Sequence, residues 1–265
     1  MSLSNRQLKY LASLSQKKYR QQHQQVIIEG VRLCEEALRS DWVLREAYVT
    51  SDFFTHSVQS RLKRLAGEKH LTLQEISPEE MERITDTRSP QSIAILADLP
   101  EQKQFIPDRD RHPQILMLDR VSDPGNLGTL CRSADWFGVR HILFGPGSVE
   151  WSNPKVLRSS MGSVFRIQLV EIADWTATMS ELEDSGYVLL GAGMAGKEAK
   201  TVSQSLQNQP WALLLGNEAH GLSEELTPSL DEIMTIPGNG PADSLNVAMA
   251  GTVLLYELAT SSSKL

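Results

Sequence analysis

The chain has few of the features that mark secreted, metal-binding or membrane proteins. Only two of its 265 residues are cysteines, and Cys34 and Cys131 lie too far apart for a zinc-type spacing. No His/Cys cluster indicates a metal centre, so we expect no metal. The opening MSLSNRQLKY lacks the apolar stretch of a signal peptide, and no uninterrupted apolar run is long enough to cross a bilayer. We therefore expect a cytoplasmic protein with no membrane segment, whose two thiols are reduced core residues.

Positive charge is scarce overall but concentrated at one end. The net charge is −7 at pH 7, which argues against a polyanionic partner for the chain as a whole. Residues 1–28 nevertheless contain five lysines and arginines and no acidic residue, whereas the charged residues of 171–234 are acidic except for Lys197 and Lys200. A solvated basic helix is the ordinary explanation of such a segment. The asymmetry also fits a protein that meets a polyanion with its first segment only.

Hydrophobic patterning predicts two α/β domains. In residues 1–98 an amphipathic helix at 4–20 precedes alternating strands and helices, and SIAILAD at 92–98 is the last strand. Residues 99–113 are polar, contain three prolines and form the best linker candidate. Beyond them, continuous apolar runs alternate with helical stretches, as in a parallel sheet covered on both faces, and 245–259 is a final helix. The runs are QILML, VRHILF, FRIQLV, YVLLGA, WALLLG and EIMTIP.

The segment VLLGAGMAGKEAK (188–200) raises the possibility of a dinucleotide-dependent oxidoreductase. Gly191, Gly193 and Gly196 have the G-x-G-x-x-G spacing that cradles a pyrophosphate. That motif needs a helix directly after the third glycine, because the first amides of the helix bind the phosphates. The residues that follow offer only a thin apolar stripe for such a helix. The oxidoreductase stays the weaker alternative.

A second segment, LDRVSDPGNLGTLCRSADWFGV (118–139), predicts a strand, a turn at 123–125 and a helix with Asn126 at its N-cap. One face of that helix is apolar and should pack on the sheet. Arg132 and Trp136 lie on the other side. Because a large exposed aromatic residue often marks an interface, we expect this side to meet a partner such as a second copy of the chain.

Two further segments carry polar residues at the ends of apolar runs. In LLLGNEAHGLSEEL (213–226), Glu218 follows a buried strand, where a simple surface carboxylate is the ordinary alternative. In IPGNGPADSLNVAMAGTVLLYEL (236–258), Ser244 is the predicted N-cap of the final helix. Asn246 would then lie inside the first turn, where helix propensity does not explain it.

In their order and spacing, these last three segments resemble the three sequence motifs of the SpoU/TrmH family of RNA 2'-O-methyltransferases, in the SPOUT superfamily. The resemblance is strong over 114–260. Residues 1–98 resemble the small substrate-binding domain of the family more loosely, through VIIEGVRLCEEAL and SPQSIAILAD.

The resemblance implies a fold and an activity. The fold would be a small N-terminal α/β substrate-binding domain at 1–98, a linker at 99–113, and a C-terminal parallel-sheet α/β domain with a trefoil knot at 114–265. The activity would be transfer of a methyl group from S-adenosyl-L-methionine to a ribose 2'-hydroxyl of tRNA or rRNA. The enzyme would work as a homodimer through the catalytic domain. A non-catalytic RNA-binding homologue is a further alternative, which the retained motif residues disfavour.

The same resemblance implies the residues of the site. The catalytic residues would be Asn126, Arg132, Glu218, Ser244 and Asn246. The cofactor would lie against Gly191, Gly193, Leu215, Gly216, Ile236 and Leu245. RNA phosphates would meet Arg6, Lys9, Lys17, Lys18, Arg20 and Arg32.

The role of Arg132 follows from its chemistry. A guanidinium keeps its proton at neutral pH, so this side chain is better suited to grip a phosphate and stabilise a developing alkoxide than to act as a base. Two positions depart from the pattern of the family. Gly238 stands where many relatives have Met, and Ala219-His220 stand where relatives often have Gly first. Neither departure removes a proposed catalytic side chain.

Overall fold

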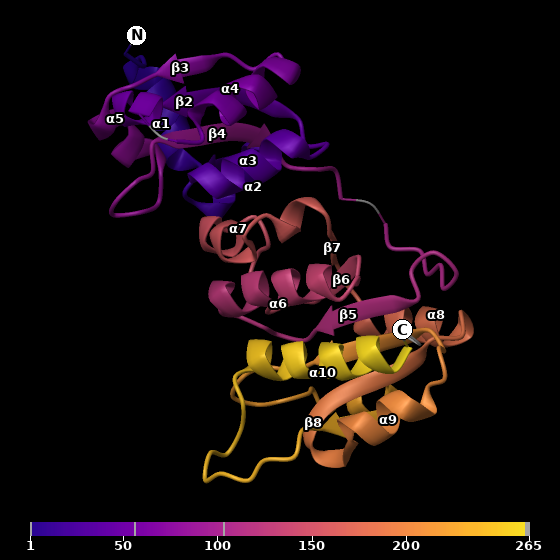
Figure 1. The fold of residues 1–265 in the computed structure, drawn as a ribbon. Helices are drawn as coiled ribbons and strands as arrows, with labels where there is room; N and C mark the ends of the chain where they lie inside the picture. Colours follow the sequence, from indigo (N-terminus) through magenta and orange to yellow (C-terminus); the bar gives the residue numbers. More distant parts are fainter. Residues whose placement is uncertain (1, 56, 103, 263–265) are drawn as a thin grey trace. The chain divides into compact units, whose positions relative to one another are not determined.

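The computed structural model describes residues 2–55, 57–102 and 104–262, and the chain forms two compact units (Figure 1). The first unit consists of Met1–Glu101 and Glu150–Phe165, and the second of Gln102–Val149 and Arg166–Leu265. Residues 150–165 therefore pack with the first unit, although both neighbouring stretches of chain belong to the second. Pattern reasoning could not find this excursion, because its ion pairs join residues 72 to 130 positions apart.

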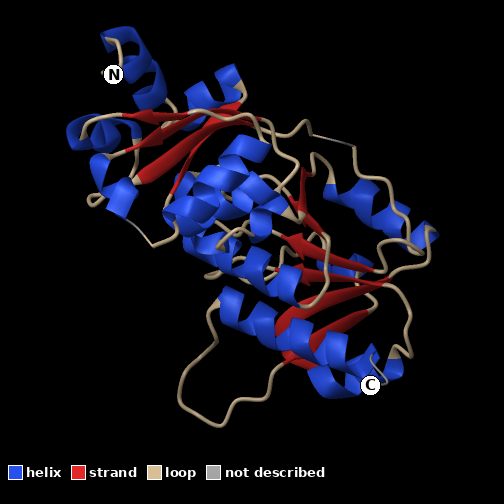
Figure 2. Cartoon of the chain, turned by 45° about the horizontal axis from the view of Figure 1, so that its top comes forward, coloured by secondary structure: helices blue, strands red, loops and turns tan. Residues whose placement is uncertain are grey.

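The first unit is a four-stranded mixed sheet with helices, as the alternating pattern predicted (Figure 2). The strand order is β1-β4-β2-β3, in which β4 is antiparallel to both β1 and β2, and β2 is parallel to β3. The strands are β1 (Gln25–Glu29), β2 (Leu44–Val49), β3 (Leu73–Glu75) and β4 (Ile93–Asp98). The helices are α1 (Asn5–Ser13), α2 (Lys17–His23), α3 (Val31–Arg39), α4 (Gln59–Glu68), α5 (Pro78–Ile84) and, from the excursion, α7 (Pro154–Ser160).

The predicted helix at 4–20 is wrong in one respect, because the chain breaks it into α1 and α2. Ser4 starts α1 through a capping box with Gln7. At the break, the Arg20 guanidinium donates to the backbone carbonyls of Leu14 at 2.9 Å and Ser15 at 2.7 Å. These carbonyls would otherwise lack partners at a helix end, so the arginine satisfies the polar groups that the break exposes.

Arg20 also fixes the excursion to the first unit. Its side chain is 2% exposed and forms an ion pair with Glu150 at 2.7 Å. Trp42 adds edge-to-face ring contacts with Trp151 and Phe165, at centroid distances of 5.8 and 4.8 Å. A buried ion pair is costly to break by removing one partner, because a charge is then left buried and alone.

The second unit is the predicted all-parallel sheet, in the order β10-β8-β9-β5-β6-β7. Its strands are β5 (Gln114–Leu118), β6 (His141–Phe144), β7 (Gln168–Glu171), β8 (Val188–Glu198), β9 (Trp211–Leu215) and β10 (Glu232–Thr235). Its helices are α6 (Pro124–Trp136), α8 (Trp175–Asp184), α9 (Ala199–Ser205) and α10 (Val247–Ser262). None of the helices in the described part of the chain is long and apolar enough to span a membrane.

Alternate residues of the central strands face two helical layers, which explains their continuous apolar runs. Met117 and Leu214 belong to a buried cluster with Met179 of α8. On the other face, α6 lies beside α10 (Figure 1). A Cβ built on Gly251 of α10 would come within 2.6 Å of both Leu130 and Leu215, so this helix approaches α6 and β9 more closely than a side chain would allow. The trefoil knot stays a prediction.

Candidate active site

The second unit gathers polar residues where β5 and β9 end. The chain runs from β5 to β6, which pairs with one edge of β5, and later places β9 along the other edge of β5. Ligands of open α/β sheets bind at such a switch point. Asp119, directly after β5, is buried, and its carboxylate accepts hydrogen bonds from the backbone N–H of Ser223 at 3.0 Å and from the Ser223 hydroxyl at 2.6 Å. This pair ties the loop after β9 to the end of β5.

Three of the five predicted catalytic residues form one hydrogen-bonded chain. The Asn126 side-chain nitrogen donates to Glu218 Oε1 at 2.8 Å, and Asn126 Oδ1 accepts from the side chain of Asn246 at 3.0 Å. Asn217 shapes the loop around Glu218, because its Oδ1 accepts from the backbone N–H groups of Ala219 and His220. The structure thus brings together residues from all three motifs.

Two helix starts differ from the prediction. Asp123, not Asn126, caps α6, since its carboxylate accepts from the N–H groups of Gly125 and Asn126. Asn246, not Ser244, caps α10, because its Oδ1 accepts from the N–H groups two and three residues later, at 2.9 and 3.3 Å. The capping role explains why an asparagine stands at 246. It also holds the side chain of Asn246 in place for Asn126.

Ser244 and Arg132 stand apart from this chain of hydrogen bonds. Ser244 lies in the exposed loop that leads to α10 and lines a cavity. Arg132 is exposed on α6, six residues after Asn126, and has no hydrogen bond or ion pair with any residue that the structure describes. Its neighbour one turn on, Trp136, is 83% exposed. The structure therefore leaves the Arg132 side of α6 open, as the sequence predicted.

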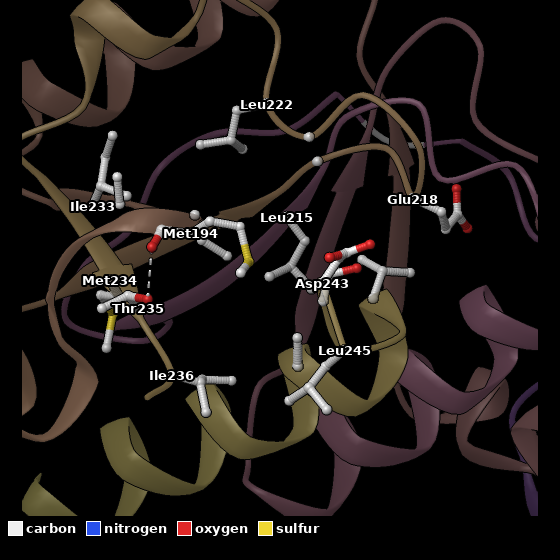
Figure 3. A pocket seen from close by; sticks show the side chains of 18 of the residues that line it. Met194, Leu215, Glu218, Leu222, Ile233, Met234, Thr235, Ile236, Asp243 and Leu245 are labelled. Atoms are coloured by element: carbon white, nitrogen blue, oxygen red, sulfur yellow. Dashed lines mark hydrogen bonds between the residues drawn. The ribbon is translucent and has the colours of Figure 1, made fainter. Parts of the chain in front are cut away.

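A cavity of about 700 Å³ opens beside these residues, between the ends of β8 and β9 and the loops after β9 and β10 (Figure 3). Five of the six predicted cofactor residues line it: Gly193, Leu215, Gly216, Ile236 and Leu245. Gly191 does not. A Cβ on Gly191 would come within 2.5 Å of Leu230 and 2.9 Å of Leu222, so this glycine permits packing behind the wall.

The glycine motif forms one wall of the cavity through a bulge. In the register of β8 with β10, Ile233 pairs with Gly191 but Met234 pairs with Lys197, so residues 192–196 leave the ladder. A Cβ on Gly196 would lie 2.2 Å from the Ile233 carbonyl oxygen, which makes a side chain impossible there. The strand continues through all three glycines, and α9 begins only at Ala199. This is not the strand-to-helix turn of a dinucleotide fold.

The cavity fits an adenosine-containing cofactor of moderate size. Its volume lies within the range of small-molecule sites, and its walls are largely aliphatic. Sequence reasoning missed Met194, which the bulge carries and which is 71% exposed. Figure 3 shows its side chain directed toward Leu215 in the hollow. The hydroxyl of Thr235 donates to the Met194 carbonyl at 3.3 Å and so supports the bulge. The exposure of Met194 and its place in the cavity are visible only in the structure, so the sequence carried no signal for it.

The predicted phosphate-binding residues lie in the first unit, and for one of them, Arg20, the prediction is wrong. Arg20 is buried against Glu150, so its guanidinium is not available to RNA. Arg32 is exposed in the first turn of α3. The remaining cations, Arg6, Lys9, Lys17 and Lys18, are all exposed on α1 and α2.

Comparisons with known proteins agree with this geometry. The model of the SpoU rRNA Methylase family matches residues 113–256, and that of an MRM3-like substrate binding domain matches 5–95. The 23S rRNA (guanosine(2553)-2'-O)-methyltransferase RlmP of Bacillus subtilis is 32% identical over 259 residues, which cover 97% of each chain.

Two solved structures align over nearly their full length. A TrmH-family protein from Porphyromonas gingivalis has 32% identity and a TM-score of 0.83, covering 97% of this chain and 98% of that one. An AdoMet-bound rRNA methyltransferase from Sinorhizobium meliloti has 27% identity and a TM-score of 0.82, covering 98% of this chain and 97% of that one.

Fold and site together define an S-adenosylmethionine-dependent RNA methyltransferase of the SPOUT class. The chain belongs to the SpoU rRNA methylase family. The predicted fold class, enzyme class and cofactor are confirmed. Neither the oxidoreductase nor the non-catalytic binder finds support.

Proposed function

We propose that this enzyme methylates a ribose 2'-hydroxyl of ribosomal RNA at the cavity beside Asn126, Glu218 and Asn246. The observation that carries the proposal is the hydrogen-bonded chain of these three side chains at the rim of a cavity that fits the cofactor. The choice of ribosomal over transfer RNA is supported by the description of the matching family and by the relative RlmP.

Bound S-adenosylmethionine supplies an electrophilic methyl group on a sulfonium centre. The work of the chain is to align the ribose with it, which alone can lower a barrier by roughly 7–11 kcal/mol when the geometry is near attack. Asn126 is held by two partners, so it can present a fixed amide to the ribose. Ser244, whose hydroxyl makes no hydrogen bond to a described residue, is free to donate to the ribose or its phosphate. Glu218 positions Asn126.

Arg132 would grip the phosphate next to the target ribose and stabilise charge that develops on the 2'-oxygen. We propose that it does so across a homodimer interface. On α10, Met249, Val253 and Tyr256 are exposed at helical spacing and form one apolar stripe. The stripe lies on the helix that packs beside α6, which carries the exposed Trp136. Large exposed apolar patches mark interaction sites, and a second copy would cover this one.

The proposed location is the cytoplasm, which suits the two thiols. Burial raises the pKa of Cys34, and burial raises the pKa of Cys131 to about 12, so both stay protonated core residues.

Methyl transfer to defined RNAs tests the proposal. The protein is incubated with labelled S-adenosylmethionine and unmodified transcripts of ribosomal or transfer RNA. A 2'-O-methyl group removes the hydroxyl that attacks the next phosphodiester, so the product resists alkaline cleavage at one bond. We expect one such position in ribosomal RNA, and none with Glu218→Ala. Label on a base, or in transfer RNA alone, would contradict the proposal.

A further inference from the structure

The hairpin of α1 and α2 carries four exposed cations. Arg6, Lys9, Lys17 and Lys18 are exposed and form no ion pair with any described residue. On α1, Arg6 and Lys9 point away from the side that buries Leu8 and Leu11. No carboxylate occurs in the first 28 residues.

Elsewhere in the first unit, four surface arginines are matched with acids. Arg39 and Arg61 both pair with Glu35, at 3.0 and 2.6 Å. Arg64 pairs with Glu68 at 2.6 Å, and Arg45 pairs with Asp98 at 2.5 Å. The helices α1 and α2 instead carry exposed cations on a segment without acidic residues, and a polyanion is the partner that this charge complements.

Three aromatic rings bridge the two helices next to these cations. His23 of α2 meets Tyr10 of α1 edge to face, at a centroid distance of 5.0 Å. It also lies parallel to Tyr19, at 6.5 Å and an interplanar angle of 12°. Lys18 lies 5.8 Å from the centroid of the Tyr19 ring. All three rings are half-buried, so each is held by packing while part of it stays open to solvent. We call Tyr10, His23 and Tyr19 the aromatic ladder.

We propose that the aromatic ladder stacks an unpaired base of the RNA substrate, while the cations of α1 and α2 hold the flanking phosphates. The inference rests on the proposed function for the identity of the polyanion as RNA. Single-stranded nucleic acids bind where a positive groove follows the backbone and aromatic side chains stack bases. The bases of a duplex are already stacked on each other, so the ladder selects a loop, bulge or end.

Stacking and phosphate binding respond differently to salt, and this separates the two parts of the proposal. Each phosphate contact adds about 0.7 to the slope of log affinity against log salt for a single strand, whereas stacking adds none. Binding is measured by fluorescence anisotropy without cofactor, using a labelled 12-nucleotide oligoadenylate and a blunt 12-base-pair RNA duplex as probes.

We expect Tyr19→Ala to weaken binding of the oligoadenylate by about 5- to 100-fold at every salt concentration, with an unchanged slope. Tyr19→Phe should bind like the wild type, because the Tyr19 hydroxyl makes no hydrogen bond to a described residue. Tyr19→Leu keeps an apolar side chain at the position and must also weaken binding. Replacing Lys17 and Lys18 together by Gln should lower the slope by about 1.4. Circular dichroism and urea denaturation of each variant report that the first unit, which carries these residues, is folded.

The matched control is Phe54→Ala, because Phe54 is another exposed ring of the same unit with a lysine, Lys63, over it at 4.9 Å. Unchanged affinity in Tyr19→Ala overturns the proposal. So does a loss as large for Phe54→Ala, or an equal loss on the duplex. A wild type that shows the expected binding pattern but methylates no RNA would overturn the proposed function alone.

Discussion

The side-chain amide of Asn126 makes two hydrogen bonds: its nitrogen donates to Glu218 at 2.8 Å, and its oxygen accepts from Asn246 at 3.0 Å. Asn246 is held in turn as the cap of α10, where its own Oδ1 accepts two backbone N–H groups. The orientation of Asn126 is therefore fixed by residues 92 and 120 positions away. An asparagine can satisfy this arrangement because it offers a donor and an acceptor, whereas an aspartate offers acceptors only.

Asn126→Asp should place a carboxylate against Glu218 and drive the loop after β9 away. We expect methyl transfer to fall at least 100-fold, and stability to fall by up to about 1 kcal/mol because the pair is exposed. Adding Glu218→Gln restores a donor opposite the introduced carboxylate and should recover the stability in urea denaturation. A double variant as unstable as Asn126→Asp would show that the two side chains do not interact in solution.

Met194→Ala should weaken cofactor binding, because the methionine extends from the bulge of β8 into the cavity. Covering about 40 Å² of its apolar surface would contribute about 1 kcal/mol, or about fivefold in affinity. Isothermal titration with S-adenosylmethionine measures this change. Met194→Leu keeps the apolar bulk and serves as the control. Equal affinities for all three proteins would mean that the side chain does not touch the cofactor.

Tyr256→Lys should produce a monomer, since it places a charge in the apolar stripe of α10. Light scattering after size-exclusion chromatography measures the mass. Thr176→Lys adds the same charge to an exposed position on α8 and should stay dimeric. We expect the monomer to bind cofactor weakly and to transfer no methyl groups. A wild-type protein that is itself monomeric and active would refute the proposed interface.

Acid should destabilise the second unit through His141. Burial lowers the pKa of this side chain, and His112, whose ring centroid lies 4.1 Å away, lowers it further. Below about pH 6.5 this histidine is protonated in the unfolded chain but stays neutral in the folded chain. The free energy of unfolding therefore decreases as the pH falls, by up to about 1.4 kcal/mol per pH unit. In urea denaturation from pH 7.5 to 5, His141→Gln should show a flatter dependence. His70→Asn, at an exposed position with φ of 55°, should behave like the wild type.

The sequence predicted the sheet of the second unit well, because its strands are continuous apolar runs that need both faces covered. The sequence-based prediction was wrong where a polar side chain stabilises the fold instead of binding a ligand. Arg20 looks like one more cation of a basic helix, but its guanidinium satisfies two carbonyls at a helix break and pairs with Glu150. Partners 130 positions apart leave no local pattern.

The candidate site shows the same limit. The motifs predicted which residues matter, but spacing carries no information on which of them touch. Asn246 acts as a cap rather than a first-turn residue, and the glycines at 191–196 form a bulge rather than a phosphate turn. The cap depends on the path of the chain after β10, and the bulge depends on the pairing of β8 with β10; periodicity encodes neither.

Single-turnover methyl transfer by Arg132→Ala measures what the Arg132 guanidinium contributes to the reaction. The rate is measured on a ribosomal RNA transcript that the wild type methylates, with RNA saturating and its affinity determined separately. We expect near-normal RNA binding and a rate lowered by about 100- to 1,000-fold, the cost of removing a group that stabilises charge in the transition state. An Arg132→Ala enzyme that binds RNA normally and keeps most of its rate would contradict this role.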